Sequence, residues 1–174
     1  MDLRIAVTKR QFDCQRTSNL QLPREPDMNR LIALIVAPWL LASVAWAAEP
    51  PVYTGLLSNT GAGGYDTVSY FEQGGPAKGS SEYTTEYQGA TWRFSNAENL
   101  AQFKANPDRF VPAYGGYCAW AVSQGYLAKG DPKHWSIRDG RLFLNYNQSV
   151  QESWLENTDE LITQADANWP AVLK

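Results

Sequence analysis

Two segments of the chain alternate apolar and polar side chains with the period of two that is typical of β-strands. The first segment, residues 82–95, has Gln88-Gly89 at its centre, and a two-residue turn there predicts a β-hairpin. The predicted cross-strand pairs are Tyr87 with Ala90, Thr85 with Trp92 and Tyr83 with Phe94. These six side chains would share one face, and the polar side chains would cover the other.

The second segment, residues 135–144, has the same form around the turn Asp139-Gly140. The predicted cross-strand pairs are Arg138 with Arg141, Ile137 with Leu142 and Trp135 with Leu144. The last two pairs place four large apolar side chains on one face of the hairpin. The sequence therefore predicts two antiparallel hairpins separated by about 40 residues of other structure, longer than a simple loop.

A helical pattern follows each predicted hairpin. Ser95 and Glu98 have the spacing of a capping box and predict a helix that ends before Pro107. Residues 147–167 place apolar side chains at a period near 3.6, with a predicted break at Asn157-Thr158-Asp159. The C-terminal part is therefore expected to be helical.

Shorter helical turns are predicted near Asp66, which can cap one, and over residues 117–124. No internal repeat is evident along the chain. The pattern predicts an α+β fold, a small single domain with two antiparallel β-hairpins, in one sheet or two, packed against short helices and a C-terminal helix.

The beginning of the chain has the composition of a targeting segment. Arg30 precedes an apolar stretch over residues 31–44, and Ala45-Trp46-Ala47 resembles a cleavage site. This order predicts a secretory signal peptide that is cleaved after Ala47, and hence a periplasmic protein. A membrane anchor is the alternative, but the apolar stretch is shorter than the roughly 20 residues that a spanning helix needs.

The polar residues before Met28 match no structural element, and we interpret them as an extension from a start codon assigned too early. The expected organisation has four parts. They are an N-terminal extension over 1–27, a signal peptide over 28–47, an irregular lead-in over 48–63 and a folded domain over 64–170.

The charge and cysteine content of residues 48–174 argue against some classes of partner and of stabilising bond. This part carries nine Lys or Arg and fourteen Asp or Glu, so its net charge of about −5 disfavours nucleic acid and anionic membranes as partners. Contact with the membrane is expected only transiently, through the signal peptide. Cys118 is its single cysteine, so no internal disulfide can form, and stability must come from an aromatic-rich core.

The stretch over residues 114–121, Tyr-Gly-Gly-Tyr-Cys-Ala-Trp-Ala, is the candidate binding site. Glycines allow the backbone to approach a guest closely, and aromatic rings can line a small concave site. The alternative is that the glycines only form a turn and the rings only fill the core. The predicted binding residues are Tyr114, Gly115, Gly116, Tyr117, Cys118 and Trp120.

Several motifs give the chain a family resemblance. Trp92-Arg93-Phe94-Ser95, followed by Phe103, Asn106-Pro107 and Phe110, is similar to the YHS domain, a module in which an aromatic-rich strand leads into a short helix. Over nearly all of 64–170 the chain resembles secreted bacterial YHS domain-containing proteins. Metal-linked YHS modules resemble a Phe-Cys-Ser-x-x-Cys pattern, and here Ser95 and Asn99 stand at the two cysteine positions. The resemblance therefore implies no metal role at that junction.

Cys118 permits several roles. A thiolate at the start of a helix is favoured and can attack, ligate or be oxidised, whereas an unpaired cysteine is also a common small core residue. His134 is the only imidazole, so a Cys–His pair would need it, with Asp166 or Asn168 as the orienting group. One thiol and one imidazole fall short of the four ligands of a structural zinc site.

The expected function is therefore a non-enzymatic module that binds a small ligand or a protein partner, with no cofactor, catalytic residue or metal ligand predicted. Heavy-metal handling, with copper as the metal, and a Cys118-dependent redox protein are the alternatives.

Overall fold

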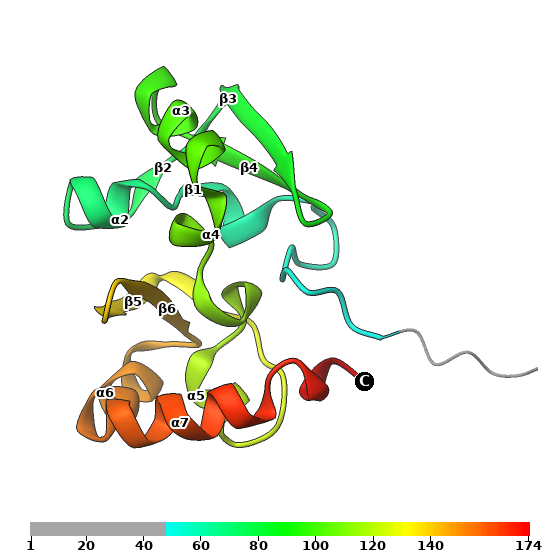
Figure 1. Ribbon diagram of the computed structural model, residues 1–174, viewed down its shortest axis with the longest axis vertical. Coiled ribbons are helices and arrows are strands. Elements are labelled where there is room, and N and C mark those ends of the chain that lie inside the picture. The colour runs from blue at the N-terminus through cyan, green and yellow to red at the C-terminus, as the bar shows by residue number, and fades with distance from the viewer. Residues whose placement is uncertain (1–47) are drawn as a thin grey trace, which may run out of the picture. The chain divides into compact units, whose positions relative to one another are not determined.

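Three two-stranded antiparallel sheets hold the strands of residues 48–174, which are the residues described by this computed structural model (Figure 1). The pairs are β1 (Tyr65–Asp66) with β2 (Ala77–Lys78), β3 (Ser80–Tyr87) with β4 (Ala90–Phe94), and β5 (Asp131–Arg138) with β6 (Arg141–Asn145). The extension and the signal peptide predicted over residues 1–47 lie outside the described residues. No helix in residues 48–174 is long and apolar enough to cross a bilayer.

Six α-helices and three 3-10 turns complete the described part of the chain. The helices are α2 (Ser69–Glu72), α3 (Ala97–Ala105), α4 (Pro107–Phe110), α5 (Ala119–Ser123), α6 (Gln148–Glu156) and α7 (Thr158–Asn168). The 3-10 turns are η2 (Gly61–Gly64), η3 (Ala113–Gly116) and η4 (Ala171–Leu173). The predicted α+β fold is confirmed, and the two hairpins form separate sheets.

The same supersecondary unit occurs twice. A 3-10 turn, a short helix, a β-hairpin and two further helices follow one another over residues 61–110, the first half, and again over residues 113–168, the second half. The two halves occupy the upper and lower parts of Figure 1. The expectation that the chain has no internal repeat is therefore wrong.

Irregular features of the backbone recur at corresponding positions in the two halves. Gln88 and Asp139 have positive φ at the two hairpin turns, and both hairpins shift register at the same distance from the turn. Asn96 and Asn147 cap α3 and α6 through their side-chain oxygens. The sequence similarity is confined to short matches such as Gly-Gly-Tyr and Ala-Lys-Gly, which explains why the repeat is not evident in the sequence.

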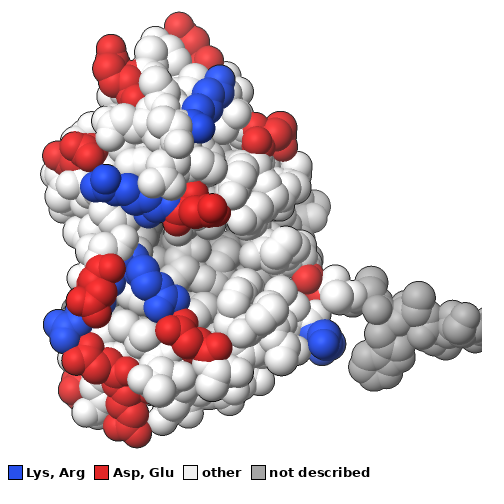
Figure 2. Space-filling view, viewed as in Figure 1, with Lys and Arg blue, Asp and Glu red and all other residues white. Residues whose placement is uncertain are grey.

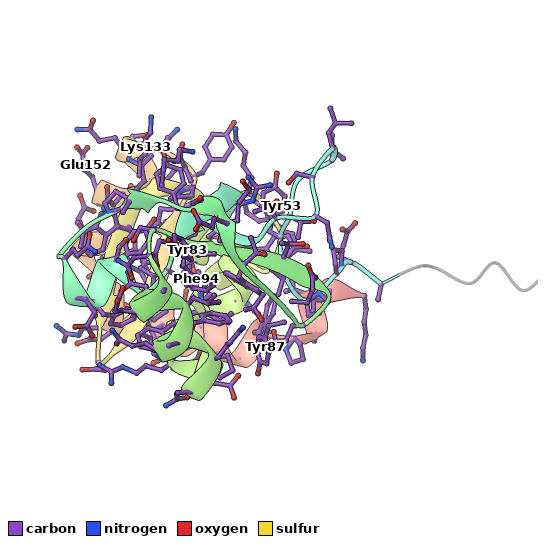
Figure 3. All side chains as sticks on the ribbon, turned by 90° about the horizontal axis from the view of Figure 1, so that it is seen from above. Tyr53, Tyr83, Tyr87, Phe94, Lys133 and Glu152 are labelled. Carbon is purple, nitrogen blue, oxygen red and sulfur yellow. The ribbon has the colours of Figure 1, made fainter. Side chains whose placement is uncertain are left out.

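Each half has its own apolar core, and a third cluster joins them. In the first half, Phe103 of α3 packs against Trp92 and Phe94 of β4. Phe94 points into the interior in Figure 3, whereas the exposed Lys133 and Glu152 project outward.

Strand β6 is buried on both of its faces. Phe143 packs on Trp154 within the second half, while Leu142 and Leu144 contact Tyr70 from helix α2 of the first half. The Tyr70 hydroxyl donates to the Pro132 carbonyl oxygen at 2.7 Å. Because α2 of the first half covers the hairpin of the second half, one face of β6 is buried only when both halves are present.

Two local predictions need correction. The Ser95–Glu98 capping box does not form, because Asn96 caps α3 and its side-chain oxygen accepts from the Asn99 N–H at 2.8 Å. The Ser95 N–H and hydroxyl donate instead to Asp66.

In the first hairpin, Phe94 pairs with Ser80 and not with Tyr83, because a bulge between Ser80 and Thr84 shifts the register. Such bulges leave no period in the hydrophobic pattern. The pairs Tyr87–Ala90 and Thr85–Trp92 are confirmed, as are the three pairs of the second hairpin.

The cap of helix α3 gives a testable prediction. Asn96→Ala removes the only side-chain acceptor at this helix start and is expected to lower the free energy of unfolding by about 1 kcal/mol. Glu98→Ala is the matched control: its side chain is exposed, so we expect a change within about 0.5 kcal/mol. Urea unfolding of both variants measures the difference. An equal loss of unfolding free energy in the two variants would contradict the Asn96 cap and favour the Ser95–Glu98 capping box.

Candidate functional site

The predicted stretch over residues 114–121 opens the second half, and Tyr114, Tyr117 and Ala119 belong to its core. Turn η3 contains left-handed φ values at Tyr114 and Gly115, after which the chain extends at Tyr117 and Cys118 and enters α5. The Cys118 N–H donates to the Ala128 carbonyl oxygen at 2.9 Å, and Tyr117 forms an antiparallel bridge with Lys129. The backbone that carries the thiol is therefore fixed by hydrogen bonds.

Gly115 allows the lead-in segment to approach this stretch. A Cβ atom on Gly115 would lie within van der Waals overlap of the Pro51 carbonyl oxygen, at 1.8 Å. The Tyr53 N–H donates to the Gly115 carbonyl oxygen at 3.0 Å. The first residue of the glycine pair therefore serves close backbone packing, and not a guest molecule.

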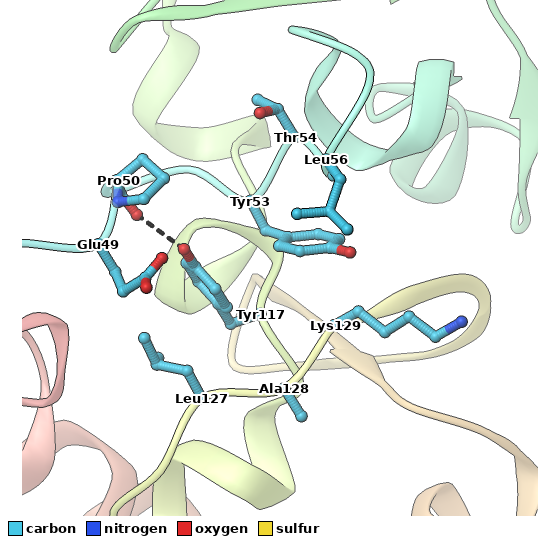
Figure 4. Close-up of a pocket in the computed structure, with 10 residues that line it drawn as sticks. Glu49, Pro50, Tyr53, Thr54, Leu56, Tyr117, Leu127, Ala128 and Lys129 are labelled. Atoms are coloured by element: carbon cyan, nitrogen blue, oxygen red, sulfur yellow. Dashed lines mark hydrogen bonds between the residues drawn. The ribbon is translucent and has the colours of Figure 1, made fainter.

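The side chains of Tyr117 and Cys118 line two different cavities. The lead-in cavity, about 290 Å³, is shown in Figure 4 and is lined by Tyr117, Tyr53, Leu56 and Leu127 among others. The Tyr117 hydroxyl donates to the Pro50 carbonyl oxygen at 3.0 Å, and its ring lies 5.4 Å from that of Tyr53, centroid to centroid. Leu56 is fully exposed at the edge of this cavity.

The thiol cavity, about 220 Å³, lies over Cys118. Its lining residues are Cys118, Trp120, Ala121, Tyr126, Ala128, Tyr146 and Val150. Cys118 itself is 1% exposed, whereas Tyr126 and Tyr146 are 49% and 45% exposed. The sulfur therefore lies at the floor of a small aromatic-walled cavity, and the two tyrosines lie at the outer, solvent-exposed part.

The electrostatic environment of the thiol contains opposing contributions. Burial raises the pKa of the Cys118 thiol, and the nearby backbone N–H groups of Ala121, Tyr146 and Trp120 oppose that shift without reversing it. The three donors come from the start of α5 and the end of β6. The net effect favours the neutral thiol, which donates to Asn145 Oδ1 at 3.8 Å.

Asn145 lies beside the sulfur and is completely buried. Its Oδ1 atom is 3.8 Å from Cys118 Sγ and accepts from the Trp120 N–H at 3.3 Å, which fixes the orientation of the amide. Its Nδ2 atom has no hydrogen-bond partner. A buried amide donor without a partner is unusual, and an acceptor placed beside it would be bound favourably.

The predicted binding residues do not share one cavity. Cys118 and Trp120 line the thiol cavity and Tyr117 lines the lead-in cavity, while Tyr114 is buried in the core of the second half. The Tyr114 hydroxyl donates to Asp166 Oδ1 at 2.8 Å, and burial raises the pKa of that hydroxyl.

Sequence reasoning missed Asn145 at the end of β6, Tyr146 directly after it and Val150 in the first turn of α6. The sequence does place Tyr146 directly before the cap of a predicted helix. No nearby residue, however, indicates that this helix start lies against Cys118. The contact depends on the parallel bridge between Cys118 and Leu144.

The groups expected to assist a Cys–His pair are engaged elsewhere. Asp166 accepts from Tyr114 and from Arg141, with which it forms an ion pair at 2.8 Å. The Asn168 amide donates to the carbonyl oxygens of Val122 and Ser123. His134 lies in β5 and is not among the residues that line the thiol cavity. Within residues 48–174, no three His, Cys, Asp or Glu side chains lie together as a metal site requires.

Comparisons with protein-family models, with curated proteins and with solved structures give no match for the chain. The chemistry of the site is therefore argued from its own geometry.

The close approach at Gly115 can be tested by substitution. Gly115→Ala adds a Cβ that collides with the Pro51 carbonyl oxygen at a positive φ, and we expect a loss of about 3 kcal/mol or more in the free energy of unfolding. Gly140→Ala is the control, because Gly140 also has positive φ but open space around it, so only about 1 kcal/mol of backbone strain is expected. Equal losses in chemical denaturation would contradict the packing role.

The thiol environment predicts the pH dependence of alkylation. In a Cys14→Ser background, Cys118 is the only thiol, and iodoacetamide reacts with its thiolate form. Because the pKa of Cys118 is raised, the folded protein should hold less thiolate near pH 8 than the urea-unfolded chain and react more slowly. The rate should keep rising above the ordinary thiol pKa of about 8.5. A rate that levels off below that pH would contradict the structure.

Proposed function

We propose that the protein is an exported module that binds a small aromatic or largely apolar molecule in the thiol cavity. The observation that carries the proposal is the coincidence of an open, aromatic-walled cavity with a buried thiol at its floor. Monomeric domains generally fill such space with side chains, so a retained cavity that reaches a polarisable group favours a ligand site.

The lining favours a planar guest. Trp120 and Tyr126 meet edge to face, with ring centroids 6.4 Å apart, and leave ring surface available on the cavity side. Ala121, Ala128 and Val150 provide apolar contact, and no carboxylate, imidazole or amine is among the lining residues. A highly charged ligand would find no counter-charge in this lining.

The surface charge agrees with a small ligand better than with a polyanion. Figure 2 shows Lys and Arg side chains interspersed with Asp and Glu on the visible face, without a continuous patch of one sign. Some basic residues are paired with carboxylates, as Arg138 is with Asp159 at 2.8 Å and Arg141 with Asp166. Nucleic-acid binding would require unpaired basic residues along one face.

The family resemblance and the targeting segment belong to the same proposal. The YHS-like motifs over residues 64–170 support membership of the secreted YHS domain-containing proteins, and the residues up to Ala47 support export to the periplasm. Mass spectrometry of the protein purified from its own host tests the export step, since a mature chain starting at Ala48 is expected.

A ligand screen tests the binding proposal. Indole, phenol and cinnamate are small planar probes, and at least one should raise the melting temperature and change the fluorescence of Trp120. Val150→Phe would fill the thiol cavity and should abolish the effect. Leu56→Ala changes only the lead-in cavity and should leave the effect intact. No response from any probe, or equal loss in both variants, would count against the thiol cavity as the site.

A further inference from the structure

We propose that the protein forms a two-fold symmetric dimer in which each copy places Leu56 and Leu57, the leucine pair, in the lead-in cavity of the other copy. The proposal goes beyond the proposed function, because it concerns a different cavity and a different partner. The surface comprises the leucine pair, the lead-in cavity and two charged residues that border this cavity.

The leucine pair is the most exposed large apolar surface in residues 48–174. Leu56 and Leu57 are 102% and 101% exposed, whereas Leu155, the next in order, is 54% exposed. A single exposed leucine needs no explanation, but two adjacent leucines that bury nothing on their own molecule form a contiguous patch. Such a patch beside a cavity is typical of a site of association.

The loop that carries the leucine pair is anchored at both ends. Before the loop, the Tyr53 N–H donates to the Gly115 carbonyl oxygen at 3.0 Å. After it, the Thr91 N–H donates to the Asn59 carbonyl oxygen at 2.7 Å. Only residues 54–58 lie between these two hydrogen bonds. Because the loop is short and fixed at its ends, presenting the leucines to a partner costs little conformational entropy.

The lead-in cavity lies directly beside the leucine pair and has room for such side chains. Its volume is about 290 Å³, roughly ten times the volume of a water molecule in the liquid. Tyr53, Tyr117 and Leu127 give it apolar surface, and Leu56 belongs to its edge. A protruding group next to a hollow suits a two-fold interface, because each copy then offers both sides of the same contact.

Two opposite charges at the lead-in cavity fit the same symmetry. Glu49 and Lys129 both line the cavity, and Figure 4 shows them on opposite sides of it, with the Lys129 side chain directed away from Glu49. Within the part of the chain that the structure describes, neither side chain forms an ion pair. The Lys129 ammonium lies 5.3 Å from the centre of the Tyr146 ring, and such a contact at an exposed site is weak.

This arrangement favours a second copy over a lipid surface as the occupant. A two-fold axis between facing cavities exchanges their two sides, so Glu49 of each copy would meet Lys129 of the other. A lipid surface gains nothing from one acid and one base placed in this way. The net charge of about −5 of residues 48–174 also opposes binding to an anionic bilayer.

Sedimentation equilibrium of the protein purified from its own host tests the association. At an ionic strength of about 0.15 M, repulsion between the net charges of two copies is largely screened beyond about 8 Å. The contact is small, so we expect a weak dimer with a dissociation constant on the order of 10 µM. The average mass should rise from one protomer to two across that concentration range. A single-protomer mass at about 1 mM would overturn the proposal.

Substitution of the leucine pair tests the apolar contact. The double variant Leu56→Ser, Leu57→Ser should raise the dissociation constant at least about tenfold. Its melting temperature, measured at a concentration where the wild-type chain is also a monomer, should be unchanged because both side chains are fully exposed.

Leu155→Ser is the matched control for the leucine pair. Leu155 is also exposed, but it borders a separate polar hollow between α6 and α7, so the dissociation constant should not change. An unchanged dissociation constant in the double variant, or an equal increase in the control, would overturn the proposal.

Charge reversal tests the two-fold arrangement. Glu49→Lys and Lys129→Glu each place like charges opposite one another in a dimer of identical chains, so each variant should dimerise at least about tenfold more weakly than the wild-type chain. An equimolar mixture of the two variants should associate as tightly as the wild-type chain, because every charge contact in the mixed dimer again joins opposite signs. Recovery on mixing cannot come from a contact within one chain.

A second mixture controls for net charge. Glu98→Lys and Lys133→Glu make the same changes in net charge at exposed positions outside the proposed surface. Mixing these two variants should leave the dissociation constant unchanged. Failure of the Glu49→Lys and Lys129→Glu mixture to recover, or an equal gain in the control mixture, would overturn the proposal.

Vesicle flotation tests the lipid alternative. The protein should not float with vesicles of phosphatidylcholine and phosphatidylglycerol. Flotation that is lost in the double leucine variant, together with a single-protomer mass in solution, would assign the leucine pair to a lipid surface and overturn the dimer.

The dimer proposal and the ligand proposal fail separately. If an aromatic probe raises the melting temperature while the protein sediments as a single protomer, the ligand proposal is supported and the dimer proposal is wrong. If the dimer forms through the leucine pair and no aromatic probe binds, the dimer proposal is supported and the ligand proposal is wrong.

Discussion

The Asp66 carboxylate is the interaction on which the arrangement of the first half depends. It is completely buried. It accepts hydrogen bonds from the Val68 N–H just after β1, from Ser95 just after β4 and from the Asn99 side chain of α3. A buried charge is tolerated only when it is fully hydrogen-bonded, so these segments must meet at one point. Loss of any one segment would leave the carboxylate incompletely satisfied. Asp66 also accepts from the Ser69 N–H and so holds the start of the short helix α2. Tyr70 of this helix packs against Leu142 and Leu144 in the hairpin of the second half.

In the second half, the Cys118 thiol occupies the position that corresponds to the Asp66 carboxylate. The Cys118 thiol donates to Asn145 Oδ1 at 3.8 Å, and the residue corresponding to Asn99 is Val150, which lines the thiol cavity. The carboxylate of the first half is buried and accepts several hydrogen bonds, whereas the thiol of the second half lines a cavity. The two copies of one backbone unit therefore differ in role, because one joins its segments through a buried carboxylate and the other borders a cavity.

Local patterns predicted the elements, and distant contacts decided the site. The α+β class, both hairpin turns and the break at Asn157 follow from period and turn chemistry, which act over a few residues. The cap at Asn96 instead of Ser95 depends on Asp66, about 30 residues away, which accepts from the Ser95 N–H and hydroxyl. The bulge that moves Phe94 from Tyr83 to Ser80 leaves no period in the sequence. Trp120 and Cys118 were predicted to bind, but Tyr146 and Asn145 complete the cavity only because β6 lies beside residue 118. Because that contact joins residues far apart in the sequence, no hydrophobic period predicts it.

The repeat also gives each half its own optical reporter. Trp92 is completely buried in the core of the first half and Trp154 in that of the second. Each corresponds to a phenylalanine in the other half, Phe143 and Phe103 respectively, so the fold already accommodates the smaller ring at both positions. The fluorescence difference between each single exchange and the wild-type chain would report one core, because the other tryptophans are common to both proteins. Whether they melt in a single cooperative step or one after the other then becomes directly observable.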